Sequence, residues 1–114
     1  MAPTHPFTLL MVEDDLAARN IIVSMIEVRF RGCAVHTADN GKEGLEQFKL
    51  HNPPIVITDI NMPVMDGVEM AREIRALNSE TKFLVLTAYG DERFYQSFSE
   101  LGFCSFLLKP VDFN

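Results

Sequence analysis

Short, nearly continuous apolar runs alternate along this chain with longer segments in which apolar residues recur every three or four positions. The short runs are typical of strands covered on both faces of a sheet, and the longer spacing is typical of helices that bury one side. Five strands are therefore predicted, and a helix falls between each one and the next. The predicted strands are 7–12, 33–38, 55–60, 82–88 and 104–108.

The predicted helices begin near Asp15, at Asp39 or Asn40, at 68 and at 91. The first is expected to end at Gly32, the second at about 51, the third at 78 and the fourth at 101. Glycine or proline accounts for three of these ends, because glycine commonly stops a helix and proline cannot continue one. The inward-facing residues expected in the first and third helices share a helical spacing. They are Ala18, Ile21, Ile22, Met25 and Ile26, and then Met70, Ala71, Ile74 and Leu77.

Strands that alternate with helices predict an α/β domain with a parallel sheet and helices on both faces. Right-handed crossovers leave few arrangements of such a chain. The flavodoxin-like, doubly wound strand order 2-1-3-4-5 is the expected one. A length of 114 residues suits one domain with one core.

Composition and charge narrow the function classes. Apolar residues make up 47% of the chain and its net charge is −6, so direct binding of nucleic acid by this domain is not expected. No apolar run approaches the roughly 18 residues of a membrane span, and the N-terminus lacks the layout of a signal peptide, so a cytoplasmic protein is expected. Cys33 and Cys104 match no metal-binding spacing and are expected to be reduced thiols.

Polar residues stand where the predicted strands end. Glu13 and Asp14 follow the first strand, Asp59 lies near the end of the third, Thr87 near the end of the fourth, and Lys109 follows the fifth. In a parallel sheet all these ends lie on the same rim, which is where open α/β sheets bind ligands. The sequence therefore predicts a site with three acids, a hydroxyl and an amine.

Three carboxylates close together repel one another unless a cation lies among them, and Mg²⁺ is the hard, oxygen-seeking cation that suits them. Such a site leaves room for a phosphoryl oxygen, with Thr87 donating to a second oxygen and Lys109 neutralising a third. Asp59 is then the expected nucleophile, which becomes an aspartyl-phosphate.

These residues, together with the segment 58–67, resemble the receiver domain of two-component response regulators from about Phe7 to the end of the chain. The resemblance implies that Asp59 accepts a phosphoryl group from a phosphohistidine of a sensor kinase or phosphotransfer protein. It also implies that Asp14 binds Mg²⁺ directly, that Glu13 acts through a water, and that Asn61 contributes its backbone carbonyl.

The resemblance further assigns Thr87 and Phe106 to a conformational switch that controls an output domain or partner. The face formed by 91–101 and 104–108 would meet that partner, with Tyr95 as a contact residue. The bond between Lys109 and Pro110 would be cis. The module would catalyse only its own phosphorylation and dephosphorylation, and so would not be an enzyme in the usual sense.

Several positions depart from the family pattern. Glu13 replaces the more frequent Asp, and Phe106 lacks the hydroxyl of a Tyr, so its inward rotamer gains no hydrogen bond. Tyr89 is bulky for its position; our hypothesis is that it shields the phosphoryl group from water, and an exposed loop tyrosine is the alternative.

The family also has a fifth helix, whereas only four residues follow Pro110 here. We therefore expect an N-terminal tail over 1–6 and a receiver domain over 7–114 that lacks its last helix. An uncovered apolar sheet face would favour association, so a homodimer is a further expectation.

Two other functions fit parts of the pattern. A Mg²⁺-dependent phosphatase or phosphotransferase with an Asp nucleophile usually carries that residue on its first strand, with a second acid two residues later, whereas Asp59 lies on the third. A flavodoxin-like carrier needs a hydroxyl- and glycine-rich loop after the first strand, where this chain has acids.

Overall fold

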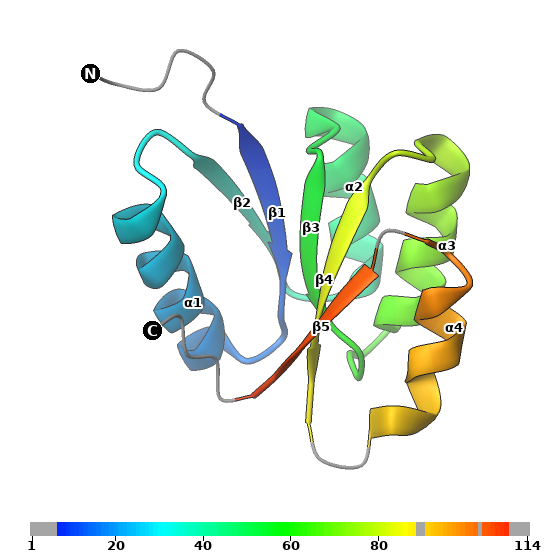
Figure 1. Ribbon diagram of the computed structural model, residues 1–114. Helices are drawn as coiled ribbons and strands as arrows, with labels where there is room; N and C mark the ends of the chain where they lie inside the picture. Colours follow the sequence, from blue (N-terminus) through cyan, green and yellow to red (C-terminus); the bar gives the residue numbers. More distant parts are fainter. Residues whose placement is uncertain (1–6, 89–90, 103, 110–114) are drawn as a thin grey trace.

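The computed structural model describes residues 7–88, 91–102 and 104–109. Within them, five strands form one parallel sheet in the order β2-β1-β3-β4-β5 (Figure 1). The flavodoxin-like order predicted from the sequence is therefore confirmed, with β2 and β5 at the edges. The strands are β1 (Thr8–Val12), β2 (Ala34–Ala38), β3 (Ile55–Asp59), β4 (Lys82–Thr87) and β5 (Cys104–Leu108).

The helices cover the two faces of the sheet unequally. One face carries α1, and the other carries α2, α3 and α4 (Figure 1). The helices of the described residues are α1 (Leu16–Arg29), α2 (Gly41–His51), α3 (Gly67–Leu77), the 3₁₀ turn η1 (Asp91–Phe94) and α4 (Tyr95–Ser99).

The prediction of one continuous helix over 91–101 is wrong, since η1 precedes a short α4. Asp91 accounts for part of this break. Its carboxylate accepts from the backbone N–H of Ala88, which lies before the helix, instead of from an N–H in the first turn, and no side chain caps α4. An uncapped first turn commonly tightens into 3₁₀ geometry.

The larger part of the core lies between the sheet and α2, α3 and α4. Alternate strand residues point toward these helices, because successive side chains of a strand face opposite ways. Its fully buried members include Leu10, Val12, Phe48, Val56, Met70, Ala71, Ile74, Phe83, Val85 and Phe98.

The face under α1 holds a smaller cluster, in which Ile22 and Ile26 pack on strand residues such as Met11. Ile21 is 57% exposed, so its predicted inward orientation is wrong. It lies about 100° around the helix from Ile22, outside the narrow stripe that contacts the sheet. Leu77, the last residue of α3, is likewise 55% exposed, against the prediction.

Side-chain caps fix where the first three helices begin. Asp15 accepts from the N–H of Ala17 at 3.0 Å, Asn40 caps α2, and Asp66 caps α3. Of the two predicted caps for α2, it is Asn40 that bonds the helix. Each such cap is worth about 1 kcal/mol. No helix in the described ranges has the length and hydrophobicity to cross a membrane.

Candidate functional site

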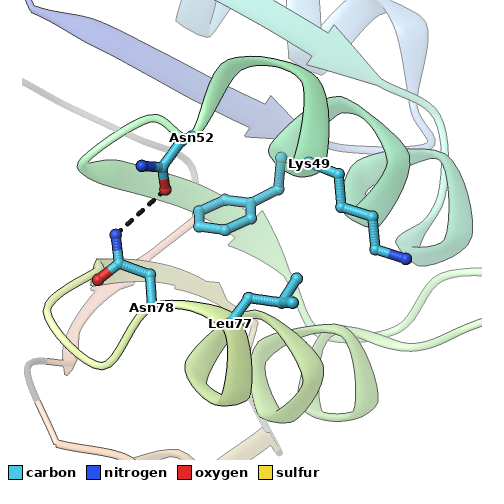
Figure 2. Close-up of a pocket in the computed structure, with 5 residues that line it drawn as sticks. Lys49, Asn52, Leu77 and Asn78 are labelled. Carbon is cyan, nitrogen blue, oxygen red and sulfur yellow. Dashed lines mark hydrogen bonds between the residues drawn. The ribbon is translucent and has the colours of Figure 1, made fainter.

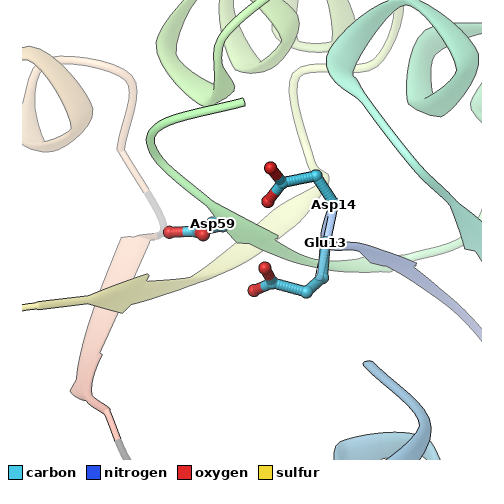
Figure 3. A group of neighbouring side chains, drawn as sticks. All are labelled: Glu13, Asp14 and Asp59. Carbon is cyan, nitrogen blue, oxygen red and sulfur yellow. The ribbon is translucent and has the colours of Figure 1, made fainter. Parts of the chain in front are cut away.

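Three acids meet where β1 and β3 end. Glu13 and Asp14 directly follow β1, and Asp59 is the last residue of β3, which pairs with β1 in the sheet. Each acid has a carboxylate oxygen within 4.8 Å of one from each of the other two (Figure 3). The rim predicted from the sequence thus forms a compact acidic cluster.

Burial makes this cluster electrostatically costly. Glu13 is 1% exposed and Asp59 is 8% exposed, while Asp14 is open to solvent. Burial, and then the charge of Asp59, raise the pKa of Glu13 to about 7. Oε2 of Glu13 accepts no hydrogen bond from the described residues.

Lys109 is the cation that faces these acids. Its Nζ lies 2.8 Å from Oδ2 of Asp59 and 3.3 Å from Oε2 of Glu13, the second distance being an ion pair without hydrogen-bond geometry. Burial by itself would lower the pKa of Lys109. The hydrogen bond and the charge of Asp59, together with the charge of Glu13, outweigh burial and raise the pKa of this lysine. Lys109 also donates its backbone N–H to the carbonyl of Thr87 at 2.8 Å, which fixes it beside β4.

The residues on either side of Asp59 hold it in place. The N–H of Ile60 donates to Oδ1 of Asp59 at 2.8 Å, and the hydroxyl of Thr58 donates to the carbonyl of Asp59, also at 2.8 Å. Gly67 packs directly on this carbonyl, because a Cβ there would lie 2.3 Å from the oxygen. The glycine at the start of α3 is thus a steric requirement of the acid's position.

The other predicted site residues lie around this centre. Thr87 is buried and donates its hydroxyl to the carbonyl of Leu107 at 3.4 Å, and Asn61 is exposed two residues beyond Asp59. Phe106 is partly buried, with its ring centroid 4.5 Å from that of Tyr95. Tyr89 and the Lys109–Pro110 bond predicted to be cis lie outside the described residues, since 89 and 110 are not described.

The donor set fits a divalent cation. Three carboxylates, one of them with a buried oxygen that accepts no hydrogen bond from the described residues, provide the hard oxygen ligands that Mg²⁺ prefers. A cation at this position would offset the repulsion between Glu13 and Asp59.

The family model of the response regulator receiver domain matches residues 9–114. The chain belongs to this family. Receiver domains are phosphoacceptor signalling modules of two-component systems, generally bind Mg²⁺, and work with histidine kinases and output domains. The family expected from the sequence is therefore confirmed.

Individual relatives agree with this assignment. The chain is 29% identical to the chemotaxis protein CheY of Bacillus subtilis, over 89% of this chain and 84% of CheY. A crystal structure of the N-terminal domain of an uncharacterized Wolinella succinogenes protein is 36% identical, has a TM-score of 0.85, and is matched over 93% of this chain and 84% of that one. The transcriptional regulatory protein ZraR of Escherichia coli is 32% identical over 93% of this chain, which spans 24% of ZraR.

A hollow of about 260 Å³ lies far from the acidic cluster, between the C-terminal ends of α2 and α3 (Figure 2). Phe48 and Leu77 are among the residues that line it, and Asn78 donates to Asn52 beside them at 3.1 Å. None of the residues predicted to act at the rim lines it.

The sequence pattern predicts Asp91 only as the start of a helix. The structure buries it to 7% exposure and joins it to Ala88, which follows Thr87, and to Asn61, itself a predicted site residue. An acid at the start of a helix gives no sequence signal for bonds that run backward along the chain.

Proposed function

We propose that this chain is a receiver domain in which Asp59 accepts a phosphoryl group from a phosphohistidine of a sensor kinase or phosphotransfer protein. The observation that carries the proposal is the meeting of Asp59 with Lys109 at 2.8 Å inside an acidic cluster, in a chain of this family. The proposed domain extends over 7–114.

In the transfer, an oxygen of the Asp59 carboxylate attacks phosphorus, and the new P–O bond forms as the P–N bond of the phosphohistidine breaks. The imidazole leaves with the electron pair and takes up a proton. Lys109 donates to Asp59 and stands beside it to balance the phosphoryl charge. Thr87 is the proposed donor to a phosphoryl oxygen once its hydroxyl leaves Leu107.

Mg²⁺ bound here would supply positive charge that offsets the charge on the phosphoryl oxygens. The residues proposed to hold it are Asp14 and Asp59 directly, Glu13 through a water, and Asn61 by its backbone carbonyl. Oε2 of Glu13 supports this assignment, because it is a buried acceptor in the cluster that takes no hydrogen bond from the described residues.

The proposed response is a shift between two conformers that changes the face formed by α4 and β5. Phe106 and Tyr95 pack together on this face, so rotation of Phe106 would alter what a partner or output domain meets. Self-association through an apolar face and shielding of the phosphoryl group by Tyr89 remain part of the proposal.

The test is phosphorylation with acetyl phosphate, or with a phosphorylated histidine kinase, in Mg²⁺. We expect stoichiometric, base-labile incorporation that Asp59→Asn abolishes and that Asp39→Asn, a change at an exposed acid near the same rim, leaves intact. Chelation of the metal should slow incorporation. Label that persists in Asp59→Asn would overturn the assignment, and repeated turnover of a small phosphoester would favour the enzyme alternative.

A further inference from the structure

Asp91 is a buried acid that the proposed chemistry does not use. It opens η1 and is 7% exposed. A buried carboxylate is costly unless both of its oxygens find donors. Its donors therefore show what the protein gains from placing it there.

The two oxygens of Asp91 bond to two different segments of the rim. Oδ2 accepts from the backbone N–H of Ala88 at 2.8 Å, and Oδ1 accepts from Nδ2 of Asn61 at 3.4 Å. The backbone N–H of Asp91 donates to the carbonyl of Ala88 at 3.1 Å. Ala88 directly follows Thr87 at the end of β4, so one side chain links the ends of β3 and β4 to the first residue of η1.

This arrangement differs from ordinary helix capping. A capping acid accepts from N–H groups two or three residues ahead of it, as Asp66 does from Glu69 at 2.9 Å. Asp91 points backward and across the rim, so its bonds do little for its own helix. They instead join the segment that follows Asp59 to the start of η1.

The geometry points to Asp91 as a positioning residue that couples occupancy of the acidic cluster to the orientation of η1 and α4. This inference rests on the proposed function, in which the carbonyl of Asn61 is a metal ligand. If Asn61 shifts toward a bound cation, its side-chain amide moves as well. Because Asp91 accepts from that amide, the first residue of η1 moves with it. Because coupling is reciprocal, a weakened link also lowers affinity for the cation.

The link matters more in this chain because Phe106 has no hydroxyl. Phe106 contacts Tyr95 of α4 through its ring, and the hydroxyl of Thr87 donates to a backbone carbonyl. Among the described residues, the bonds of Asp91 thus form a polar route from the rim to η1 that does not depend on Phe106.

The test is a Mg²⁺ titration of the whole chain, followed by backbone amide resonances in NMR spectra. In the unmodified protein, Mg²⁺ should shift the resonances of Glu13, of Asn61 and of 91–99. In Asp91→Ala, the shifts over 91–99 should fall by at least about half, the Ala88 amide should exchange faster, and the affinity for Mg²⁺ should fall about tenfold, as is usual when a residue that orients a metal ligand is removed.

Two variants separate positioning from simple stability. Asp91→Asn keeps an acceptor for Ala88 and an amide that Asn61 can bond after turning, so it should restore most of the coupling. Glu92→Ala, at the exposed next residue of η1, should behave like the unmodified protein. If Asp91→Ala does not fold, Asn61→Ala removes the other end of the link at an exposed residue, retains the backbone carbonyl, and should also reduce the shifts over 91–99.

Full shifts over 91–99 with unchanged affinity in Asp91→Ala or Asn61→Ala would overturn the inference. So would an equal loss in Glu92→Ala, or an unmodified protein whose 91–99 resonances ignore Mg²⁺. The proposed function fails by a different result, the absence of label on Asp59, so the two failures are distinguishable.

Discussion

The acidic rim, defined by Glu13, Asp14, Asp59 and Lys109, contrasts with the apolar layer between the sheet and α3. The rim gathers like charges where burial raises the pKa of Glu13 to about 7, whereas the layer buries side chains such as Ile74 completely. Burial of apolar surface stabilises the fold, and burial of like charges opposes it. The comparison shows that the apolar core and the charged cluster occupy different parts of one small domain.

The largest effect should come from breaking the apolar layer. Ile74→Ala removes a fully buried side chain and should cost about 3–4 kcal/mol of unfolding free energy, through lost burial and a residual cavity. Leu77→Ala, one turn later on α3 and 55% exposed, should cost about 0.5 kcal/mol. Urea unfolding of both variants measures this difference, and equal losses would contradict the description of α3.

The contribution of the rim to the free energy of unfolding should change with pH in the opposite sense from that of an ordinary surface acid. The pKa of Glu13 is about 7 in the folded protein, against 4.5 for the unperturbed group. As pH rises between these values the unfolded state loses its proton first, so metal-free stability should fall by at most about 3 kcal/mol. Unfolding measured from pH 4.5 to pH 7.5 in a chelator checks this.

Glu13→Gln is the matched variant for that experiment, because it keeps the shape and removes the titration. Its stability should lack the decline in this range, and Mg²⁺ should reduce the decline in the unmodified protein. A decline of the same size in Glu13→Gln would mean that another group causes it.

The smallest effect should come from the loop between the two regions. Val64 has a φ of 71° and is 77% exposed, although a β-branched residue strongly disfavours this left-handed conformation. Val64→Asn should therefore stabilise the domain by about 1 kcal/mol. Val28→Asn, at a 74% exposed helical position, should change stability little, and a matching gain there would argue against relief of strain.

Much of the fold was predictable because its signals are local. Apolar runs located the strands, helical spacing located the helices, and a cap such as Asn40 marks a helix start in the sequence itself. The misplaced residues are Ile21 and Leu77, whose apolar character fits the helical period but whose position relative to the sheet does not. Helical period alone does not specify how wide a stripe the sheet covers.

The sequence by itself determined that Glu13, Asp14, Asp59 and Lys109 share one rim, because parallel strands place their C-terminal ends together whatever their separation along the chain. The tertiary structure decided how deeply Glu13 is buried, that Lys109 contacts Asp59 at 2.8 Å, and that Asp91 bonds backward along the chain. Burial and pairing depend on which side chains meet in space. A topological rule brings residues to one edge, but packing sets the distances and the dielectric environment on which their chemistry depends.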